Sequence, residues 1–316
     1  MQIDRIGIHD SVSAVFPPEA LRAELGDRIE DHDPELAPPV VVTDDDDLTA
    51  CDAVVTFERR DAFLEELAWV HSIQAGVDRF STDAFEAAGV VLTNSTGIHG
   101  DTVGETVAGY LLAFARRLHR FRDAQGDRDW RPPAWDDPFT LVGERATVVG
   151  LGTLGGGIVE HLNGLGMTVT GVRRSGDPAE GVERVHTPDH LEDAVADARV
   201  VALAVPLTPD TRGMIDADAL AAMRDDAYLV NVSRGGVVDQ DALVSALQSD
   251  ELAGAALDVF ETEPLPSDSP LWDMPEVIVS PHSAALTRDY HRDIADLVET
   301  NLDRLDRDEP FHNRVA

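Results

Sequence analysis

The sequence contains no lysine. Its 25 basic residues are all arginine and face 60 aspartates and glutamates, so the 316-residue chain has a formal charge of −35. Without lysine, no side chain can form a Schiff base or serve a lysine-dependent phosphate loop. Binding to nucleic acid or to an anionic membrane surface needs a basic patch, so this composition predicts neither partner.

The excess of carboxylates also has a consequence for folding. Repulsion among them destabilises a compact state at low ionic strength, whereas molar salt shortens the screening length to about 3 Å. The composition is therefore typical of a halophile's cytoplasm, where the arginine guanidinium still pairs bidentately with carboxylates. An ordinary acidic protein from a mesophile is the alternative.

Cysteine and long apolar runs are scarce as well. Cys51 is the only cysteine, which excludes a disulfide within the chain and favours a small buried residue. No apolar run approaches the roughly 18 residues of a membrane span, and residues 1–10 lack the pattern of a signal peptide. We therefore expect a cytoplasmic protein of about two domains. The histidines lack the spacing of metal ligands, so no metal is expected.

Short apolar runs alternate with helical patterns along the chain, which predicts an α/β protein with parallel sheets covered on both faces. The first series of expected strands covers residues 3–8, 40–43, 53–57, 68–73 and 90–93. The second series covers residues 146–149, 168–172, 200–205, 228–232, 255–259 and 277–280.

Two long helices are expected outside these series. One covers residues 102–122 and precedes an irregular segment at 130–135, and the other covers 287–305. Because a helix follows the second series, we expect the chain to return to its first domain. The fold class is thus α/β, with two Rossmann-like or flavodoxin-like doubly wound domains and a cleft between them. One domain, expected to bind substrate, comprises 1–97 and 287–316; the other comprises 98–286.

A glycine-rich segment indicates what the second domain binds. Gly-Leu-Gly-Thr-Leu-Gly at residues 150–155 lies between an expected strand and an expected helix, the context that makes this motif specific for a dinucleotide. Its glycines allow a tight turn, close approach of a pyrophosphate and tight helix packing. The residues expected at the pyrophosphate are Gly150, Gly152, Thr153, Leu154 and Gly155.

The end of the next strand distinguishes between dinucleotides. Sheets that select NAD carry a carboxylate there for the ribose 2′-hydroxyl, but this chain has Arg173, Arg174 and Ser175. Two guanidinium groups and a hydroxyl suit a 2′-phosphate. The sequence therefore predicts NADP(H) as the preferred cofactor, with NAD(H) as the alternative.

Three polar residues follow strands of the same expected sheet. Arg234, Glu263 and His282 come after the last three strands, and ligands bind at the carboxyl edge of such sheets. A histidine beside a carboxylate can hold or release a proton near neutral pH, and an arginine can hold a substrate carboxylate. These residues are the candidate catalytic group.

With these motifs in order, the sequence resembles the D-isomer-specific 2-hydroxyacid dehydrogenase family, in particular its glyoxylate and hydroxypyruvate reductases. The resemblance extends over nearly the whole chain. It is carried by Gln74-Ala75-Gly76-Val77-Asp78, the glycine-rich segment, Pro206-Leu207-Thr208-Pro209-Asp210-Thr211, residues 231–236 and Pro281-His282.

The resemblance implies a catalytic triad of Arg234, Glu263 and His282. It implies that the backbone N–H groups of Ala75 and Gly76, together with Arg234 and His282, bind the substrate. Further positions that line the cofactor in the family are Val205, Pro206, Thr211, Val232, Ser233, Arg234 and Asp258, the last near the nicotinamide carboxamide.

The reaction expected is reduction of a 2-keto acid to a D-2-hydroxy acid, with proton transfer through His282 and Glu263. A homodimer is also implied, through the segment between residues 111 and 135. Two alternatives stay open. One is a non-catalytic, dinucleotide-sensing protein of the corepressor kind. The other is a phosphoglycerate or formate dehydrogenase, although formate has no hydroxyl proton for His282 to exchange.

Overall fold

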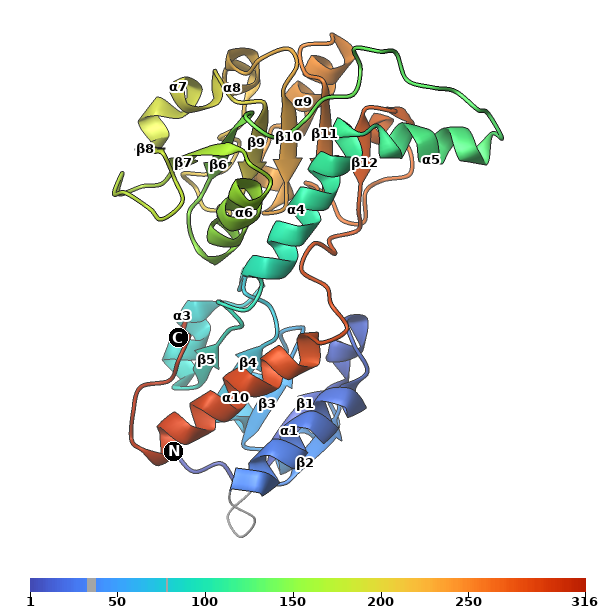
Figure 1. Ribbon diagram of the computed structural model, residues 1–316. Coiled ribbons are helices and arrows are strands. Elements are labelled where there is room, and N and C mark those ends of the chain that lie inside the picture. Colours follow the sequence, from blue (N-terminus) through green and yellow to red (C-terminus); the bar gives the residue numbers. More distant parts are fainter. Residues whose placement is uncertain (33–37, 78) are drawn as a thin grey trace. The chain divides into compact units, whose positions relative to one another are not determined.

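The structure is a computed structural model that describes residues 1–32, 38–77 and 79–316. The chain divides into two compact units. Unit 1 comprises Met1–Ile98 and Leu286–Ala316, and unit 2 comprises His99–Ala285. Because each unit has its own parallel sheet and its own helices (Figure 1), each is described by itself.

Unit 1 contains a five-stranded sheet in the order β2-β1-β3-β4-β5. All its pairings are parallel, and this order is that of flavodoxin-like folds. All five expected strands are present, although the first begins three residues later than expected. The strands are β1 (Ile6–His9), β2 (Val40–Thr43), β3 (Ala53–Thr56), β4 (Trp69–Ser72) and β5 (Val91–Thr93).

Helices cover both faces of this sheet. On one face, Leu25 and Ile294 pack with Ile8 of β1, which places α1 and α10 together there (Figure 1). On the other face, Phe63 and Phe85 are buried in the second apolar cluster of this unit. The helices are α1 (Pro18–His32), α2 (Phe63–Glu66), α3 (Thr82–Ala88) and α10 (Tyr290–Asp306), with 3₁₀ turns at Asp10–Ala14 and Leu48–Ala50. Cys51 is buried, as expected.

Unit 2 contains a seven-stranded sheet in the order β12-β11-β10-β9-β6-β7-β8, again wholly parallel. Chain order reverses between β6 and β9, as in dinucleotide-binding sheets. The sequence predicted six strands and missed the edge strand β8 (Arg184–His186), whose three residues have no apolar run. The others are β6 (Arg145–Val149), β7 (Thr168–Val172), β9 (Val200–Leu203), β10 (Tyr228–Asn231), β11 (Gly254–Leu257) and β12 (Val277–Val279).

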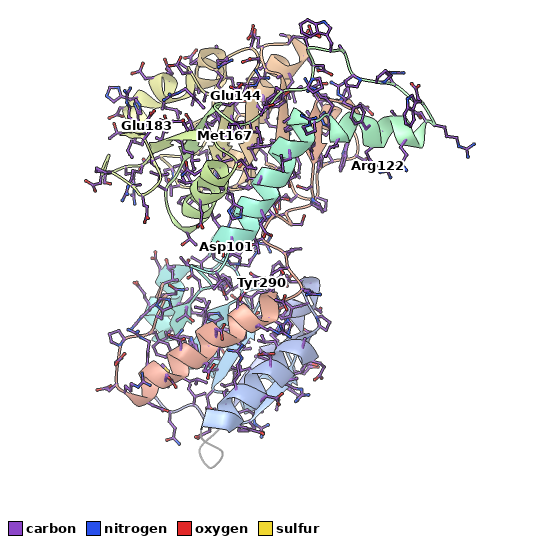
Figure 2. The ribbon with its side chains drawn as sticks, viewed as in Figure 1. Asp101, Arg122, Glu144, Met167, Glu183 and Tyr290 are labelled. Atoms are coloured by element: carbon purple, nitrogen blue, oxygen red, sulfur yellow. The ribbon has the colours of Figure 1, made fainter. Side chains whose placement is uncertain are left out.

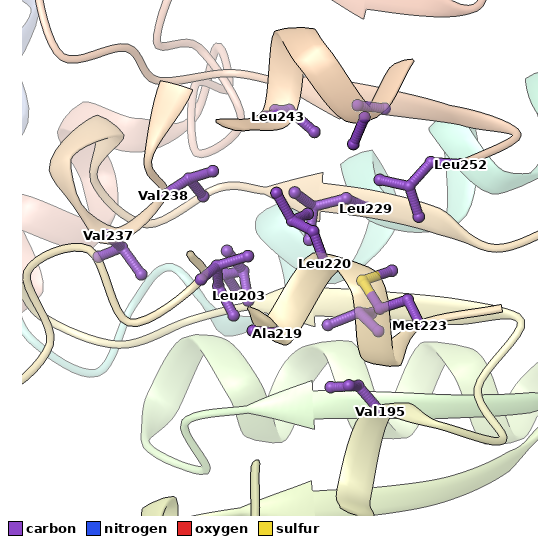
Figure 3. Packing of buried hydrophobic residues seen from close by; sticks show 14 of the residues in the cluster. Val195, Leu203, Ala219, Leu220, Met223, Leu229, Val237, Val238, Leu243 and Leu252 are labelled. Carbon is purple, nitrogen blue, oxygen red and sulfur yellow. The ribbon is translucent and has the colours of Figure 1, made fainter. Parts of the chain in front are cut away.

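The side chains of these strands alternate between two buried clusters. Figure 3 shows Leu203 and Leu229 packed among residues such as Leu220 and Leu243 on one face of the sheet. Val148 and Val230 lie in the second cluster, with residues of α4 and α6. The helices are α4 (Gly100–Ala115), α5 (Leu118–Gly126), α6 (Thr153–Gly164), α7 (Leu191–Val195), α8 (Ala217–Ala222) and α9 (Gln240–Gln248). Turns of 3₁₀ helix lie at Pro188–His190, Gly235–Val237 and Pro270–Asp273.

The single helix expected at 102–122 is wrong, because α4 ends at Ala115 and α5 begins at Leu118. Arg117 between them has a left-handed φ of 56°. Its guanidinium donates to the hydroxyl of Tyr228 and to the carbonyl of Asp137. These tertiary contacts outweigh the helical periodicity of the segment.

The expected fold class is confirmed, since two α/β domains with parallel sheets are present. Among the described residues, no helix has both the length and the apolar character needed to cross a bilayer.

Candidate active site

The glycine-rich segment connects β6 to α6 and fits a dinucleotide. Gly150 has a φ of 96°, and a Cβ there would lie 2.4 Å from the carbonyl oxygen of Ala204. A Cβ on Gly155 would lie 1.8 Å from the carbonyl oxygen of Gly150, whereas the space beside Gly152 is open. Only glycine fits at positions 150 and 155, and the open space beside Gly152 allows a bulky anion to approach the backbone.

The N-terminus of α6 adds positive polarity at the same place. Gly152 precedes the helix without a side-chain cap. Within the part of the chain that is described, the N–H groups of Thr153 and Leu154 have no acceptor. Free N–H groups and the helix dipole favour a pyrophosphate there.

Arg173, Arg174 and Ser175 follow β7 at the same edge of the sheet. The N–H of Arg173 donates to the carbonyl of His186, at 3.0 Å, so β8 fixes the backbone there. Neither guanidinium has an ion pair or a hydrogen bond with any described residue, and both Arg174 and Ser175 are exposed. In a chain of charge −35, two adjacent unpaired cations make a local anion-binding group.

The segments after β9 and β10 are held by their own hydrogen bonds. Thr211 donates from its hydroxyl to the carbonyl of Pro206, at 2.6 Å, which closes the segment that Val205 begins. Asn231 accepts from both the N–H and the hydroxyl of Ser233, after Val232. Its amide also donates to the carbonyl of Arg234, at 3.1 Å, and thereby fixes the backbone that carries this guanidinium.

His282 and Glu263 form a pair. Nδ1 of His282 lies 2.8 Å from Oε2 of Glu263, and Oε1 of Glu263 accepts from the N–H of Phe260 at 3.1 Å. The His282 side chain is 38% exposed and that of Glu263 is 32% exposed. Nε2 of His282 contacts no polar atom of the described residues, so it is available to a ligand. This geometry lets Glu263 orient the ring while Nε2 exchanges a proton.

Asp258 lies beneath this pair and is 1% exposed. Its carboxylate accepts from the hydroxyl of Ser280 at 2.6 Å and from the N–H groups of Ser283 and Ala284 at 2.9 and 2.8 Å. These bonds satisfy the buried charge and fix the segment that contains His282.

In unit 1, Ala75 and Gly76 follow β4. Asn94 donates from its side chain to the carbonyl of Ala75 at 2.6 Å, and Ser95 donates from its N–H to the carbonyl of Gln74 at 3.1 Å. With these carbonyls held, the N–H groups of Ala75 and Gly76 have no acceptor among the described residues. Adjacent free N–H groups suit an anion. Asp78, which ends this sequence motif, lies outside the described residues.

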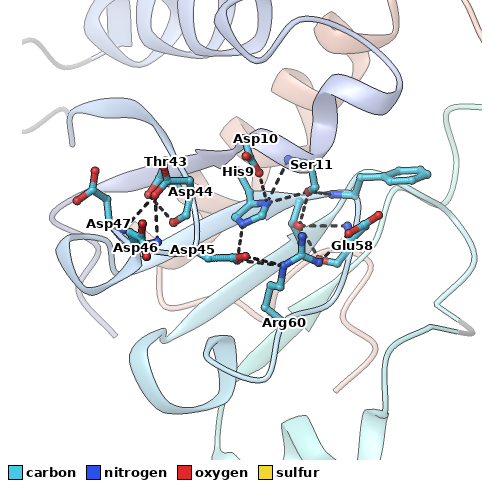
Figure 4. A network of polar contacts seen from close by, with 12 residues as sticks. His9, Asp10, Ser11, Thr43, Asp44, Asp45, Asp46, Asp47, Glu58 and Arg60 are labelled. Carbon is cyan, nitrogen blue, oxygen red and sulfur yellow. Dashed lines mark hydrogen bonds and ion pairs between the residues drawn. The ribbon is translucent and has the colours of Figure 1, made fainter.

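A polar network fixes the other strand ends of unit 1 (Figure 4). Buried His9 ends β1, and its Nδ1 accepts from the N–H of Ser11 at 3.2 Å, so Nε2 donates to Asp45 at 3.1 Å. Asp45 also accepts from Arg60, at 3.0 Å. The contacts with His9 and Arg60 outweigh burial and lower the pKa of Asp45. The run of aspartates at 44–47 is exposed, as expected, but one of its members joins three strand ends.

The structure therefore brings Glu263 and His282 into contact and places Arg234 and the cofactor residues at the same sheet edge of unit 2. Sequence reasoning missed the groups that hold them, above all the side chains of Asn231 and Ser280. A polar residue directly before or after a strand end is the only signal that the sequence offers for such anchors.

Comparison with known proteins gives one family. Residues 108–284 match the D-isomer specific 2-hydroxyacid dehydrogenase family, in its NAD binding domain. A glyoxylate reductase from Thermofilum pendens is 32% identical over 301 residues, which cover 93% of this chain and 83% of the relative.

Two solved structures are similar over almost the whole chain. A D-isomer specific 2-hydroxyacid dehydrogenase from Xanthobacter autotrophicus, in complex with NADPH and MES, has a TM-score of 0.82 and 29% identity, covering 99% of this chain and 98% of that one. An NADPH-dependent glyoxylate/hydroxypyruvate reductase from Sinorhizobium meliloti, in complex with NADP and sulfate, has a TM-score of 0.79 and 27% identity, covering 98% of each chain.

Proposed function

Since this chain belongs to the D-isomer specific 2-hydroxyacid dehydrogenase family, we propose that it reduces small 2-keto acids to D-2-hydroxy acids with NADPH. It is an oxidoreductase with a nicotinamide dinucleotide cofactor. Our proposal adds the substrate, the preference for NADPH and the roles of individual residues.

The contact of 2.8 Å between His282 and Glu263 carries this proposal. Glu263 stabilises the protonated imidazole, and Nε2 of His282 donates that proton to the carbonyl oxygen of the keto acid as it becomes a hydroxyl. When bound, a reduced nicotinamide would supply the hydride for reduction at C2. Reduction therefore requires the protonated ring of His282, and oxidation of the hydroxy acid requires the neutral ring.

Arg234 binds the substrate through its carboxylate and its carbonyl oxygen, which orients the keto acid and stabilises the negative charge that develops on that oxygen. In unit 1, the free N–H groups of Ala75 and Gly76 suit a substrate carboxylate. Residues 98–286 serve as the dinucleotide-binding domain, and residues 1–97 with 287–316 serve as the substrate-binding domain.

The residues that would hold the cofactor are those of the glycine-rich segment for the pyrophosphate and Arg173, Arg174 and Ser175 for the 2′-phosphate. Two unpaired guanidinium groups support NADPH, because a charge-assisted pair with a phosphate is stronger than any bond they offer a hydroxyl. The further positions that line it are Val205, Pro206, Thr211, Val232, Ser233 and Asp258.

Glyoxylate and hydroxypyruvate are the substrates that we propose. The support is the glyoxylate reductase from Thermofilum pendens and the glyoxylate/hydroxypyruvate reductase from Sinorhizobium meliloti.

We also propose that two copies of the chain associate through α5 and the segment that follows it. This part of unit 2 extends away from its sheet (Figure 1), and Arg122 lies on it (Figure 2). Trp130 and Trp135 there are 97% and 93% exposed, which is unusual for tryptophan in a single chain. Three arginines of this segment have no partner among the described residues and suit the acidic surface of a second copy: Arg120, Arg122 and Arg128.

Absorbance assays with NADPH and each of glyoxylate, hydroxypyruvate and pyruvate test the reaction. We expect His282→Gln to lower turnover by a factor of about 10² to 10⁴, because the proton donor is lost, while NADPH still binds. His190→Gln is the matched control. It removes an exposed histidine that also lies beside a carboxylate, 3.4 Å from Asp193, and should leave turnover unchanged.

Wild-type protein that reduces none of these acids would overturn the proposal. Full turnover in His282→Gln would overturn the role of His282 alone.

A further inference from the structure

Two hydroxyl groups of α4 hold the segment that contains His282. Thr106 donates from its hydroxyl to the carbonyl of Ala284, at 2.9 Å. The hydroxyl of Tyr110 lies 2.5 Å from that of Ser280. Because residues four apart share one face of a helix, α4 contacts both ends of segment 280–284 from a single face.

The contact at Tyr110 continues into the interior. Ser280 donates its hydroxyl hydrogen to the carboxylate of Asp258, at 2.6 Å, so Tyr110 must be the donor in its contact with Ser280. Burial raises the pKa of Tyr110, and the phenol therefore keeps its proton at neutral pH. The result is one directed chain of hydrogen bonds from α4 to a buried carboxylate, which is a stiffer arrangement than isolated contacts.

His282 needs such support. Its φ is 52°, in the left-handed region that residues with a Cβ seldom adopt. Its N–H donates to the backbone carbonyl of Asp258, at 2.8 Å. Ser280 before it and Ser283 and Ala284 after it are held by α4 and by the Asp258 carboxylate.

We propose that Thr106 and Tyr110 are positioning residues, which hold segment 280–284 so that the His282 ring stays against Glu263 with Nε2 toward the substrate. This inference rests on the proposed role of His282 as the proton donor. Neither hydroxyl contacts His282 or Glu263, so both act through the backbone of the segment.

Loss of these hydroxyls should affect the proton transfer more than cofactor binding. With the segment loosened, His282 spends less time against Glu263, which is the only titratable side chain in contact with its ring among the described residues. Turnover then falls, and keto-acid reduction declines at lower pH than in the wild type, because the protonated ring is less stabilised. Loss of folded protein alone would lower the rate equally at every pH.

The experiment compares Thr106→Val, Tyr110→Phe and the double variant with the wild type in NADPH-dependent reduction of glyoxylate across the pH range. We expect kcat to fall about 10-fold in each single variant, as for a small displacement of a reacting group. The decline of kcat on the alkaline side of the pH profile, its alkaline limb, should move to lower pH. The Kd for NADPH should stay unchanged. In the double variant, kcat should fall by less than the product of the two single-variant factors, because both hydroxyls act on one segment.

Thr106→Ser keeps the hydroxyl and should restore both kcat and the pH profile. Thr102→Val and Tyr228→Phe are matched controls. Thr102 lies one turn earlier on α4 and bonds to His99 of its own helix turn, and Tyr228 starts β10 at the opposite end of the sheet. Both controls should keep the wild-type pH profile.

Single and double variants with wild-type kcat and an unmoved alkaline limb would overturn the inference. So would a loss of kcat that Thr106→Ser does not restore. A wild type without keto-acid reduction would instead overturn the proposed function, and an active His282→Gln would overturn the role of His282 on which this inference rests.

Discussion

Individual arginines are important in this chain because positively charged side chains are scarce. Arginine supplies all 25 basic residues against 60 acidic ones, so a guanidinium without a carboxylate partner is one of the few groups that can pair with an anionic ligand. Arg173 and Arg174 are such groups among the described residues, and they follow β7, where a dinucleotide sheet recognises the ribose.

Arg173→Asp should weaken binding of NADPH about 10-fold or more, which corresponds to loss of a charge-assisted hydrogen bond of roughly 1.5–3 kcal/mol. Binding of NADH should be unchanged or tighter, because the new carboxylate can accept from a 2′-hydroxyl. Fluorescence titration of the reduced cofactors measures both constants. Arg5→Asp, an equal change of charge at an exposed site in unit 1, is the control, and an unaltered NADPH constant in Arg173→Asp would refute the assignment.

Among the elements, α4 and α5 show how tertiary contacts redirect a helical pattern. Arg117 leaves the helix to reach Tyr228 in the sheet, and α5 starts in a new direction. The two tryptophans that follow α5, Trp130 and Trp135, are almost fully exposed. A second copy of the chain is the cover that we propose.

The double variant Trp130→Ser, Trp135→Ser should dissociate this dimer. Removing two large aromatic contacts from an interface typically costs several kcal/mol of association free energy. Sedimentation should give twice the 34.2 kDa of one chain for the wild type and a single chain for the variant. Trp272→Ser, which removes a half-exposed tryptophan outside this segment, should remain dimeric. A monomeric wild type would contradict the proposal.

For the whole molecule, charge is the dominant property. The 60 acidic residues exceed the 25 arginines by 35, and repulsion among their carboxylates opposes the compact state. Ion pairs do form, such as Arg145 with Glu183, but exposed pairs contribute little to stability. We therefore expect screening by salt to stabilise the folded chain more than these pairs do.

The melting temperature should rise steeply between 0.1 M and 1 M KCl, over which the Debye length falls from about 10 Å to about 3 Å. Calorimetry in KCl measures the effect. A non-ionic osmolyte at equal osmolarity is the control, since it is excluded from the surface but screens no charge. A flat profile in KCl, or an equal rise in the osmolyte, would show that repulsion does not limit stability.

Much of the fold and of the candidate site can be predicted from the sequence alone. The apolar periodicity of the strands and helices predicts two α/β domains, and the glycines of segment 150–155 predict a dinucleotide site. Each of these signals lies within a few neighbouring residues. Arg234, Glu263 and His282 are recognisable for the same reason, since each lies in the segment that follows an apolar strand.

Tertiary structure alone decided the rest. The edge strand β8, the break at Arg117 and the bonds from α4 to segment 280–284 all depend on contacts between separate segments of the chain. No local sequence pattern predicts such partners, because they depend on which segments the folded sheet brings together. The sequence thus determined which chemical groups this protein has, and its packing determined which of them can act together.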